Sequence, residues 1–413
     1  MPKESHDVVI IGAGPVGSIA AAMLKRAGVA ALVLEGQQFP RFSIGESLLP
    51  YCMTYIEQAG MLDLVNRAGF QLKDGAVFWR DGKQATFDFT KKYGAGPGTT
   101  FQVQRADFDK LLADEAAGMG VEIRYGHKVG AVSLDPSPSL DITTDQGDGY
   151  QLDCRFVLDA SGFGRVLPRL LDMEQPSEFP VRSSVFTHIS DGIGASGHAG
   201  YDRNKILIIV HPEHSDVWYW LIPFSNGRSS LGVVGEPQLL QSLGDDPLSA
   251  LKLLVSQDRG LADLLKNADY DTEARQMTGY AANVTSLWGK GFALLGNAGE
   301  FLDPIFSSGV TIAMKSAGLA APLVAKQLGG EPVDWEADYA QPLKLGVDTF
   351  KEFVTSWYDG KFQDVVFAPP SRDDNVRSMI CAILAGYAWN QDNPYVAQTR
   401  RRLEALVEVC RGQ

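Results

Sequence analysis

Residues 7–35, DVVIIGAGPVGSIAAAMLKRAGVAALVLE, contain the pattern that decides the fold of this chain. The apolar run at residues 8–11 is typical of a parallel strand that is buried on both faces. A glycine-rich turn follows it, and then come a predicted helix at residues 18–27 and a second apolar strand at residues 31–34. A strand, a tight turn, a helix and a second strand in this order predict a parallel β-α-β unit.

The turn carries three glycines with the spacing G-x-G-x-x-G, namely Gly12, Gly14 and Gly17. In such a unit the first glycine allows the tight turn, the second lets a pyrophosphate approach the backbone, and the third lets helix and strand pack closely. The phosphates would bind the open N–H groups at the helix N-terminus. Glu35 ends the second strand at the usual spacing for a ribose hydroxyl, which favours a ribose without a phosphate. The stretch therefore predicts a dinucleotide site.

The same glycine spacing occurs a second time at residues 192–197, GIGASG. Glycine and turn residues follow it where a helix would have to begin, so we predict a flexible hairpin loop there. The one close pair of histidines, His211 and His214, has no further ligand cluster beside it, and we expect no metal site.

The composition is that of a globular protein, with 45% hydrophobic and 21% charged residues in a chain of 413. The formal net charge of −13 argues against a nucleic-acid partner, because no basic stripe is available to neutralise phosphates. Four scattered cysteines without C-x-x-C spacing argue against a disulfide framework and for a reducing compartment. With no signal peptide and no apolar run long enough to span a bilayer, we expect a cytoplasmic protein without an integral membrane segment.

Two further regions complete the predicted architecture. An apolar strand at residues 151–158 ends in an acid and glycines, Asp159-Ala-Ser-Gly162, as a strand of the first sheet would. Residues 180–235 instead carry alternating, β-branched and aromatic runs separated by turn signals, which predict an antiparallel sheet. Residues 247–267 read as helical, a strand at residues 291–296 returns to the first sheet, and a mostly helical tail from residue 334 is long enough to cover a cleft.

Several single positions carry local predictions. Asp107 is placed to cap a helix at residues 108–118. Lys73 begins a strand pattern, where a lysine by itself is usually a solvated edge residue. Trp218 and Trp220 stand two residues apart and therefore on one face of a strand. They form either a core-facing pair or a rigid aromatic wall beside a ligand.

The chain resembles the flavin-dependent halogenases, within the p-hydroxybenzoate-hydroxylase-like FAD proteins. The motifs that carry the resemblance are G-A-G-P-V-G at 12–17, I-G-E-S-L-L-P at 44–50, G-F-x-x-K-x-G at 69–75, W-Y-W-L-I-P at 218–223 and F-L-D-P-I-F-S-S-G-V at 301–310. The glycines are common to all such flavoproteins, whereas the tryptophan strand and the lysine are specific to the halogenases. The F-S-S-G-V form resembles the branch that acts on phenols and pyrroles.

The resemblance implies an α/β fold in which a Rossmann-type FAD-binding domain carries an inserted antiparallel substrate sheet and a helical C-terminal region over the cleft. Its parts would be 1–75, 101–175 and 286–330 for FAD binding, 76–100 and 176–285 for the substrate sheet, and 331–413 for the helical tail. Roles follow position by position. Lys73, Trp218, Trp220 and Ser308 would be catalytic, and Ser308 and Gly309 would hold a halide. FAD would be bound by Gly12, Gly14, Pro15, Val16, Gly17, Glu35, Ser47, Arg105, Asp159, Gly162, Asp303, Gly309 and Val310.

The implied reaction starts from FAD reduced by a separate flavin reductase, which reacts with O₂ to give a C4a-hydroperoxide. Chloride or bromide attacks it and yields hypohalous acid. Lys73 delivers this halogen to an electron-rich phenol or pyrrole, free or tethered to a carrier protein, by hydrogen bonding or as a haloamine. The two tryptophans would keep the substrate away from the flavin. Such enzymes belong to secondary metabolism.

Two departures from the family pattern matter. Gly296-Asn297 replaces the usual glycine-aspartate, which alters one contact to the ribityl chain, and Phe306 replaces the glutamate of tryptophan-type halogenases, which argues against free tryptophan as substrate. The alternatives are a monooxygenase, a dehydrogenase or a geranylgeranyl-reductase-like enzyme on the same scaffold, and a flavin-binding or carrier-docking protein without turnover.

Overall fold

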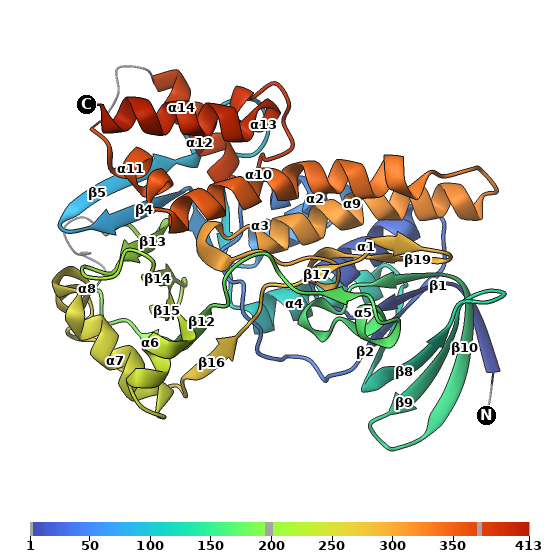
Figure 1. Cartoon of the computed structure of the whole chain (residues 1–413). Coiled ribbons are helices and arrows are strands. Elements are labelled where there is room, and N and C mark those ends of the chain that lie inside the picture. Colours follow the sequence, from blue (N-terminus) through green and yellow to red (C-terminus); the bar gives the residue numbers. More distant parts are fainter. Residues whose placement is uncertain (1–2, 195–200, 370–373, 413) are drawn as a thin grey trace.

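The computed structural model describes residues 3–194, 201–369 and 374–412, and two large sheets organise the fold (Figure 1). The first sheet has the order β18-β19-β10-β1-β2-β7, with β9 and β8 added antiparallel beside β10. The pairs around β1 are all parallel, as the predicted β-α-β unit requires. Its strands are β1 (Lys3–Ile11), β2 (Ala31–Glu35), β7 (Glu122–Tyr125), β8 (His127–Ser133), β9 (Ser139–Thr144), β10 (Gly149–Asp159), β18 (Trp288–Gly289) and β19 (Phe292–Leu294).

The second sheet has the order β16-β12-β15-β14-β13-β4-β5 and is antiparallel except where β13 pairs with β4. Its strands are β4 (Gly75–Arg80), β5 (Lys83–Asp88), β12 (Ser183–Ser190), β13 (Lys205–Val210), β14 (Trp218–Pro223), β15 (Arg228–Gly235) and β16 (Arg275–Thr278). Two short ribbons join β3 (Gln71–Lys73) to β6 (Thr100–Gln102) and β11 (Glu174–Gln175) to β17 (Asn283–Val284). The predicted α/β fold with an inserted antiparallel sheet is confirmed.

Alternation along β14 gives the second sheet two different faces. Trp218 and Trp220 belong to the large core that the sheet shares with the nucleotide-binding part and the C-terminal helices. Tyr219 and Leu221, on the opposite face, belong to a smaller core under α6 (Pro237–Ser242), α7 (Pro247–Gln257) and α8 (Arg259–Leu264). A period of two therefore directs both tryptophans toward the interior between the sheets.

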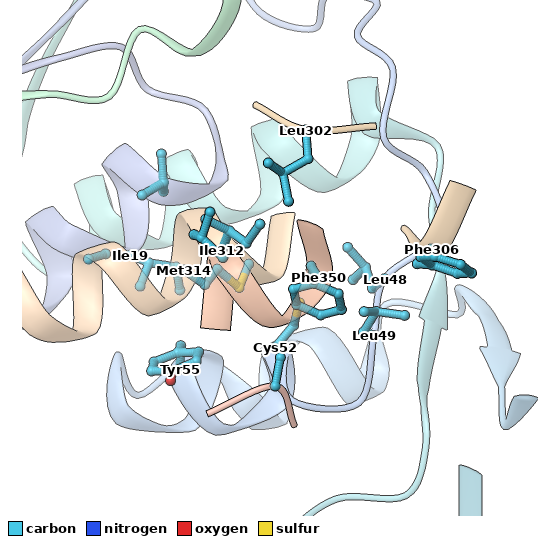
Figure 2. Packing of buried hydrophobic residues seen from close by; sticks show 14 of the residues in the cluster. Ile19, Leu48, Leu49, Cys52, Tyr55, Leu302, Phe306, Ile312, Met314 and Phe350 are labelled. Atoms are coloured by element: carbon cyan, nitrogen blue, oxygen red, sulfur yellow. The ribbon is translucent and has the colours of Figure 1, made fainter. Parts of the chain in front are cut away.

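The long helix α9 (Gly309–Leu328) runs through the middle of the molecule (Figure 1). Figure 2 shows side chains from α9 meeting those of α1, α2 and α10. The remaining helices are α1 (Pro15–Arg26), α2 (Cys52–Gln58), α3 (Leu62–Arg67), α4 (Arg105–Gly118), α5 (Val166–Leu170), α10 (Gln341–Tyr358), α11 (Lys361–Phe367), α12 (Asp374–Leu384), α13 (Pro394–Ala397) and α14 (Thr399–Arg411). The red C-terminal helices lie above β4 and β5 in Figure 1.

Three local predictions need correction. Asp107 does not cap α4, because the helix begins at Arg105 and the extended Gln104 is its N-cap. The helix predicted at residues 247–267 is two helices, since Asp258 adopts an extended conformation and its carboxylate accepts a hydrogen bond from the Leu261 N–H, which starts α8. Lys73 is not a solvated edge residue, because its side chain is fully buried.

Of the second glycine motif, residues 192–194 have no regular structure and residues 195–197 lie outside the described part of the chain. No helix within residues 3–194, 201–369 and 374–412 is long and apolar enough to cross a membrane.

Candidate active site

A cavity of about 650 Å³ lies between the two sheets. At one end it is lined by the turn after β1 and by Glu35 at the end of β2, and at the other end by Trp218 and Trp220 of β14. The carboxyl ends of parallel strands are where an α/β sheet presents its ligand contacts. Twelve of the predicted site residues line the cavity: Gly12, Gly14, Pro15, Val16, Glu35, Ser47, Arg105, Gly162, Trp218, Trp220, Gly309 and Val310.

The nucleotide end of the cavity fits the ADP half of FAD. Gly14 is the N-cap of α1 and lines the cavity, and a Cβ built there would meet only an Arg41 nitrogen at 3.5 Å, so the backbone is open to a pyrophosphate. A Cβ at Gly17 would instead lie 1.9 Å from the Gly12 carbonyl oxygen, so Gly17 serves the packing of helix on strand. The Glu35 carboxylate accepts hydrogen bonds from Ala13 N–H (2.9 Å) and Gln37 N–H (3.0 Å), which fix its position at the cavity wall.

A second helix N-terminus opens into the same cavity. Ser307, Gly309 and Val310 line it where α9 begins, and Ser307 has a left-handed backbone conformation (φ 56°) that turns the chain into the helix. Ser308 is the N-cap of α9 and is 2% exposed. Because the first N–H groups of a helix have no partner within the helix, this turn can hold an anion or a polar edge of a ligand.

Two arginines, Arg105 and Arg41, form part of the cavity wall. Arg105 forms two hydrogen bonds with the buried Asp109 carboxylate (2.6 and 3.0 Å) and donates a third to the Ile44 carbonyl oxygen (2.5 Å). Arg41 also binds Asp109 (3.2 Å) and lines the cavity. No sequence motif marks Arg41, because it lies in an irregular loop.

Three predicted cofactor residues, Gly17, Asp159 and Asp303, do not line the cavity. Both Asp159 oxygens accept backbone hydrogen bonds, from Ser161 N–H (2.9 Å) and Leu167 N–H (2.7 Å), so this carboxylate holds its own turn together. Burial raises the pKa of Asp159. Asp303 is also buried, and burial raises its pKa to about 6. Asn297, the residue that departs from the family pattern, does line the cavity.

Asp303 belongs to a chain of hydrogen bonds that joins the tail to the site. Tyr358, the last residue of α10, donates to Asp303 Oδ2 (2.9 Å), and its hydroxyl oxygen accepts the Trp218 Nε1–H (3.0 Å). Arg182 stacks its guanidinium over the Tyr358 ring at 4.3 Å. No sequence motif pointed to Tyr358, because its role depends on how the tail folds back over the two sheets.

The two indoles are fixed side by side, with ring centroids 5.9 Å apart. The Trp220 Nε1–H donates to Ser230 Oγ on β15 (3.0 Å). The indoles are 1% and 5% exposed and line the cavity at the end opposite Glu35. They therefore form a rigid aromatic wall of the cavity.

Lys73 lies directly behind this cavity. Its side chain is fully buried, and its Nζ donates hydrogen bonds to Ser47 Oγ and the Leu48 carbonyl oxygen, both at 2.7 Å. The ring of Phe89 lies 5.6 Å from the amine. Within the described residues no carboxylate forms a salt bridge with Lys73, and burial lowers the pKa of its ammonium to about 7. Lys73 does not line the cavity itself, but its partner Ser47 does.

Known proteins resemble this chain along nearly its whole length. The model of a family described as an FAD binding domain matches residues 5–331. The flavin-dependent halogenase armH3 of Armillaria mellea is 30% identical, over 99% of this chain and 85% of the relative. A 1H-pyrrole-2-carbonyl peptidyl-carrier-protein chlorinase of Pseudomonas fluorescens is 25% identical, over 99% of this chain and 95% of the relative.

A solved structure of a flavoprotein/dehydrogenase from Cytophaga hutchinsonii superposes with a TM-score of 0.94 at 41% identity, covering 99% of both chains. The cavity with its two helix N-termini and the matching family model agree on FAD as the cofactor. The chain belongs to the flavin-dependent halogenase family of FAD-binding oxidoreductases.

Proposed function

We propose that this protein halogenates an electron-rich aromatic ring and that Lys73 delivers the halogen. The observation that carries the proposal is the fully buried Lys73 amine, which has no acidic partner among the described residues and binds a serine of the cavity wall. When bound, reduced FAD supplies the electrons with which O₂ is activated and a halide is converted to hypohalous acid. The Ser308-Gly309 turn at the start of α9 would hold that halide through its N–H groups.

The environment of Lys73 suits this delivery. With a pKa of about 7, both the ammonium and the neutral amine are populated near neutral pH. The ammonium can donate a strong hydrogen bond to hypohalous acid, and the neutral amine can take up the halogen as a haloamine. In the hydrogen-bonded route the ring gains the halogen, and its proton leaves with the hydroxide as water. In the haloamine route water leaves when the N–halogen bond forms, and the proton that the ring loses on halogenation restores the amine. The two routes remain alternatives.

The surroundings favour an aromatic substrate. Phe306 packs edge-on against Trp357 (6.0 Å) and Phe362 (5.6 Å), so apolar rings from the tail stand beside the start of α9. Trp218 and Trp220 would separate this substrate from the flavin and so suppress direct hydroxylation. The relative named as acting on a pyrrole attached to a carrier protein supports a carrier-tethered pyrrole as the ring, and a phenol or a free pyrrole is the alternative. We further propose that a separate flavin reductase supplies the reduced cofactor.

A single-turnover experiment tests the proposal. The protein is mixed with chemically reduced FAD, O₂ and either bromide or chloride, and a small phenol traps the product. Mass spectrometry should detect the halogenated phenol with wild type and with Lys83→Met, which alters an exposed lysine. Lys73→Met should lose the product while keeping FAD binding. Halogenation that persists in Lys73→Met would show that the lysine assignment is wrong.

A second candidate is a dehydrogenase or monooxygenase on the same scaffold. Two observations favour it: Lys73 does not line the cavity, and the 41% identical structure carries the name flavoprotein/dehydrogenase. In the same experiment this candidate predicts a product that does not depend on halide, or hydrogen peroxide alone from a protein that plainly binds FAD.

A further inference from the structure

We propose that Ser47 is a positioning residue that orients the Lys73 amine and connects it by a hydrogen-bonded path to the flavin cavity. This inference rests on the proposed function, and it replaces a cofactor contact as the main role of Ser47. Three observations carry it: the contact between the two side chains, the position of Ser47 in the cavity wall, and the way in which one strand holds both residues.

The contact itself is short and enclosed. Lys73 Nζ lies 2.7 Å from Ser47 Oγ, with the lysine fully buried and the serine 5% exposed. Ser47 lines the cavity and Lys73 does not. Among the described residues the Ser47 hydroxyl has no side-chain partner other than Lys73, so its proton is free to point toward the cavity. A proton that leaves the Lys73 ammonium can thus pass to Ser47 Oγ while the serine proton passes to an acceptor in the cavity.

Strand β6 holds the two residues in this arrangement. On one edge Thr100 of β6 pairs with Lys73 of β3, and on the other edge Gln102 forms a bridge with Ser47. The Leu48 N–H donates to the Phe101 carbonyl oxygen (3.2 Å), which extends this second pairing. A single three-residue strand therefore sets the distance between the amine and the hydroxyl, and little freedom remains for either side chain.

The other ionisable groups near Lys73 and Ser47 are paired with other residues or neutral, so Ser47 is the polar link between the Lys73 amine and the cavity. Asp74, next to Lys73, is held by Lys205 at 2.7 Å, and Glu46, next to Ser47, is held by His188 at 2.5 Å. Cys52 on α2 lies near Lys73, and a thiolate there would interact with the ammonium. Burial raises the pKa of the Cys52 thiol, however, and keeps it neutral. Asp88 precedes Phe89 and contacts Lys91 at 3.6 Å. Arg105, on α4, is bound to Asp109.

The test measures Lys73 directly in the protein without FAD. Lysine labelled with ¹³C at Cε is titrated by NMR in wild type, Ser47→Ala and Ser47→Thr, and the Lys73 signal is identified by its loss in Lys73→Met. Ser43→Ala is the matched control, since Ser43 also lines the cavity but its Oγ lies only 3.5 Å from the neighbouring Ile44 carbonyl oxygen. Circular dichroism verifies that each variant folds.

We expect the Lys73 pKa to fall further in Ser47→Ala, because the ammonium loses an acceptor, and to remain near the wild-type value in Ser47→Thr and Ser43→Ala. Phenol halogenation at pH 7 should fall at least about tenfold in Ser47→Ala and recover in Ser47→Thr, with FAD affinity within about twofold of wild type. An unchanged Lys73 titration in Ser47→Ala, or a loss confined to FAD affinity, would overturn the inference. If wild type fails to halogenate, the proposed function falls, while the titration still decides whether Ser47 controls Lys73.

Discussion

Replacing Lys73 by methionine should change stability in a way that depends on pH. An unfolded lysine titrates near 10.5, whereas burial lowers the Lys73 pKa to about 7 in the folded protein. Between these values the unfolded state binds more protons, so the free energy of unfolding of wild type rises with pH. The protonated amine therefore destabilises the fold at neutral pH, and the effect disappears above about pH 10.

The magnitude follows from the two pKa values. At 1.36 kcal/mol per pKa unit, the Lys73 penalty is about 4 kcal/mol at pH 7 and about 2 kcal/mol at pH 9. Lys73→Met removes this penalty, but it also leaves Ser47 Oγ and the Leu48 carbonyl oxygen without their donor, which costs about 1–3 kcal/mol at any pH. The absolute difference between the two proteins is therefore less informative than its slope with pH.

The assay is urea unfolding of the FAD-free protein at pH 7, 8 and 9. The stability of Lys73→Met relative to wild type should decline by about 2 kcal/mol over this range. Lys83→Met, which alters an exposed lysine, should show no such trend. A constant difference between Lys73→Met and wild type from pH 7 to 9 would refute the reasoning, because it would mean that the buried amine does not titrate near neutrality.

Three further predictions concern the cavity and the tail. Tyr358→Phe removes the hydrogen bonds to Trp218 and Asp303, and urea unfolding should show a loss of about 1–3 kcal/mol; wild-type stability in this variant would contradict the hydrogen-bonded chain. Burial raises the Asp303 pKa to about 6, so the free energy of unfolding of wild type should fall by about 2 kcal/mol as the pH rises from about 4 to 6, and Asp303→Asn should abolish this dependence; parallel stability curves of the two proteins over that range would argue against it. Gly17→Ala places a Cβ 1.9 Å from the Gly12 carbonyl oxygen, so titration with FAD should show at least about tenfold weaker binding or a loss of the fold; unaltered affinity would mean that the turn can move.

The nucleotide-binding half of the fold was predictable because its signals are local. Residues 7–35 contain a whole strand–turn–helix–strand unit, and each glycine acts on neighbours within a few residues or on the adjoining strand. The alternation that places Trp218 and Trp220 on one face follows from strand geometry alone, and the structure has both indoles in the large core.

The environment of Lys73 was not predictable from local pattern. In the sequence Lys73 begins a strand pattern, which suggests an edge, but in the structure it is the last residue of β3. Ser47 and Leu48, which lie 26 and 25 positions earlier in the chain, fold over it and supply its acceptors. Tyr358 reaches Trp218 across 140 residues of chain. Such contacts depend on tertiary packing, which cannot be predicted from a short stretch of sequence. Asp159 and Asp303 were predicted to lie beside the cofactor from their motif positions, and in the structure their carboxylates accept hydrogen bonds from the Leu167 N–H and the Tyr358 hydroxyl. A motif position alone does not determine which way a carboxylate points.

The two-faced strand β14 restricts how this protein can change during evolution. Its odd side carries Tyr219 and Leu221 into one core, and its even side carries Trp218 and Trp220 toward the cavity. A slip of one residue would exchange the two sets, whereas a slip of two would preserve the faces. The connections on either side of β14 can therefore vary in length and sequence as long as the strand keeps its phase. New substrate preferences should arise in those connections and in the tail, and the strand itself should change slowly.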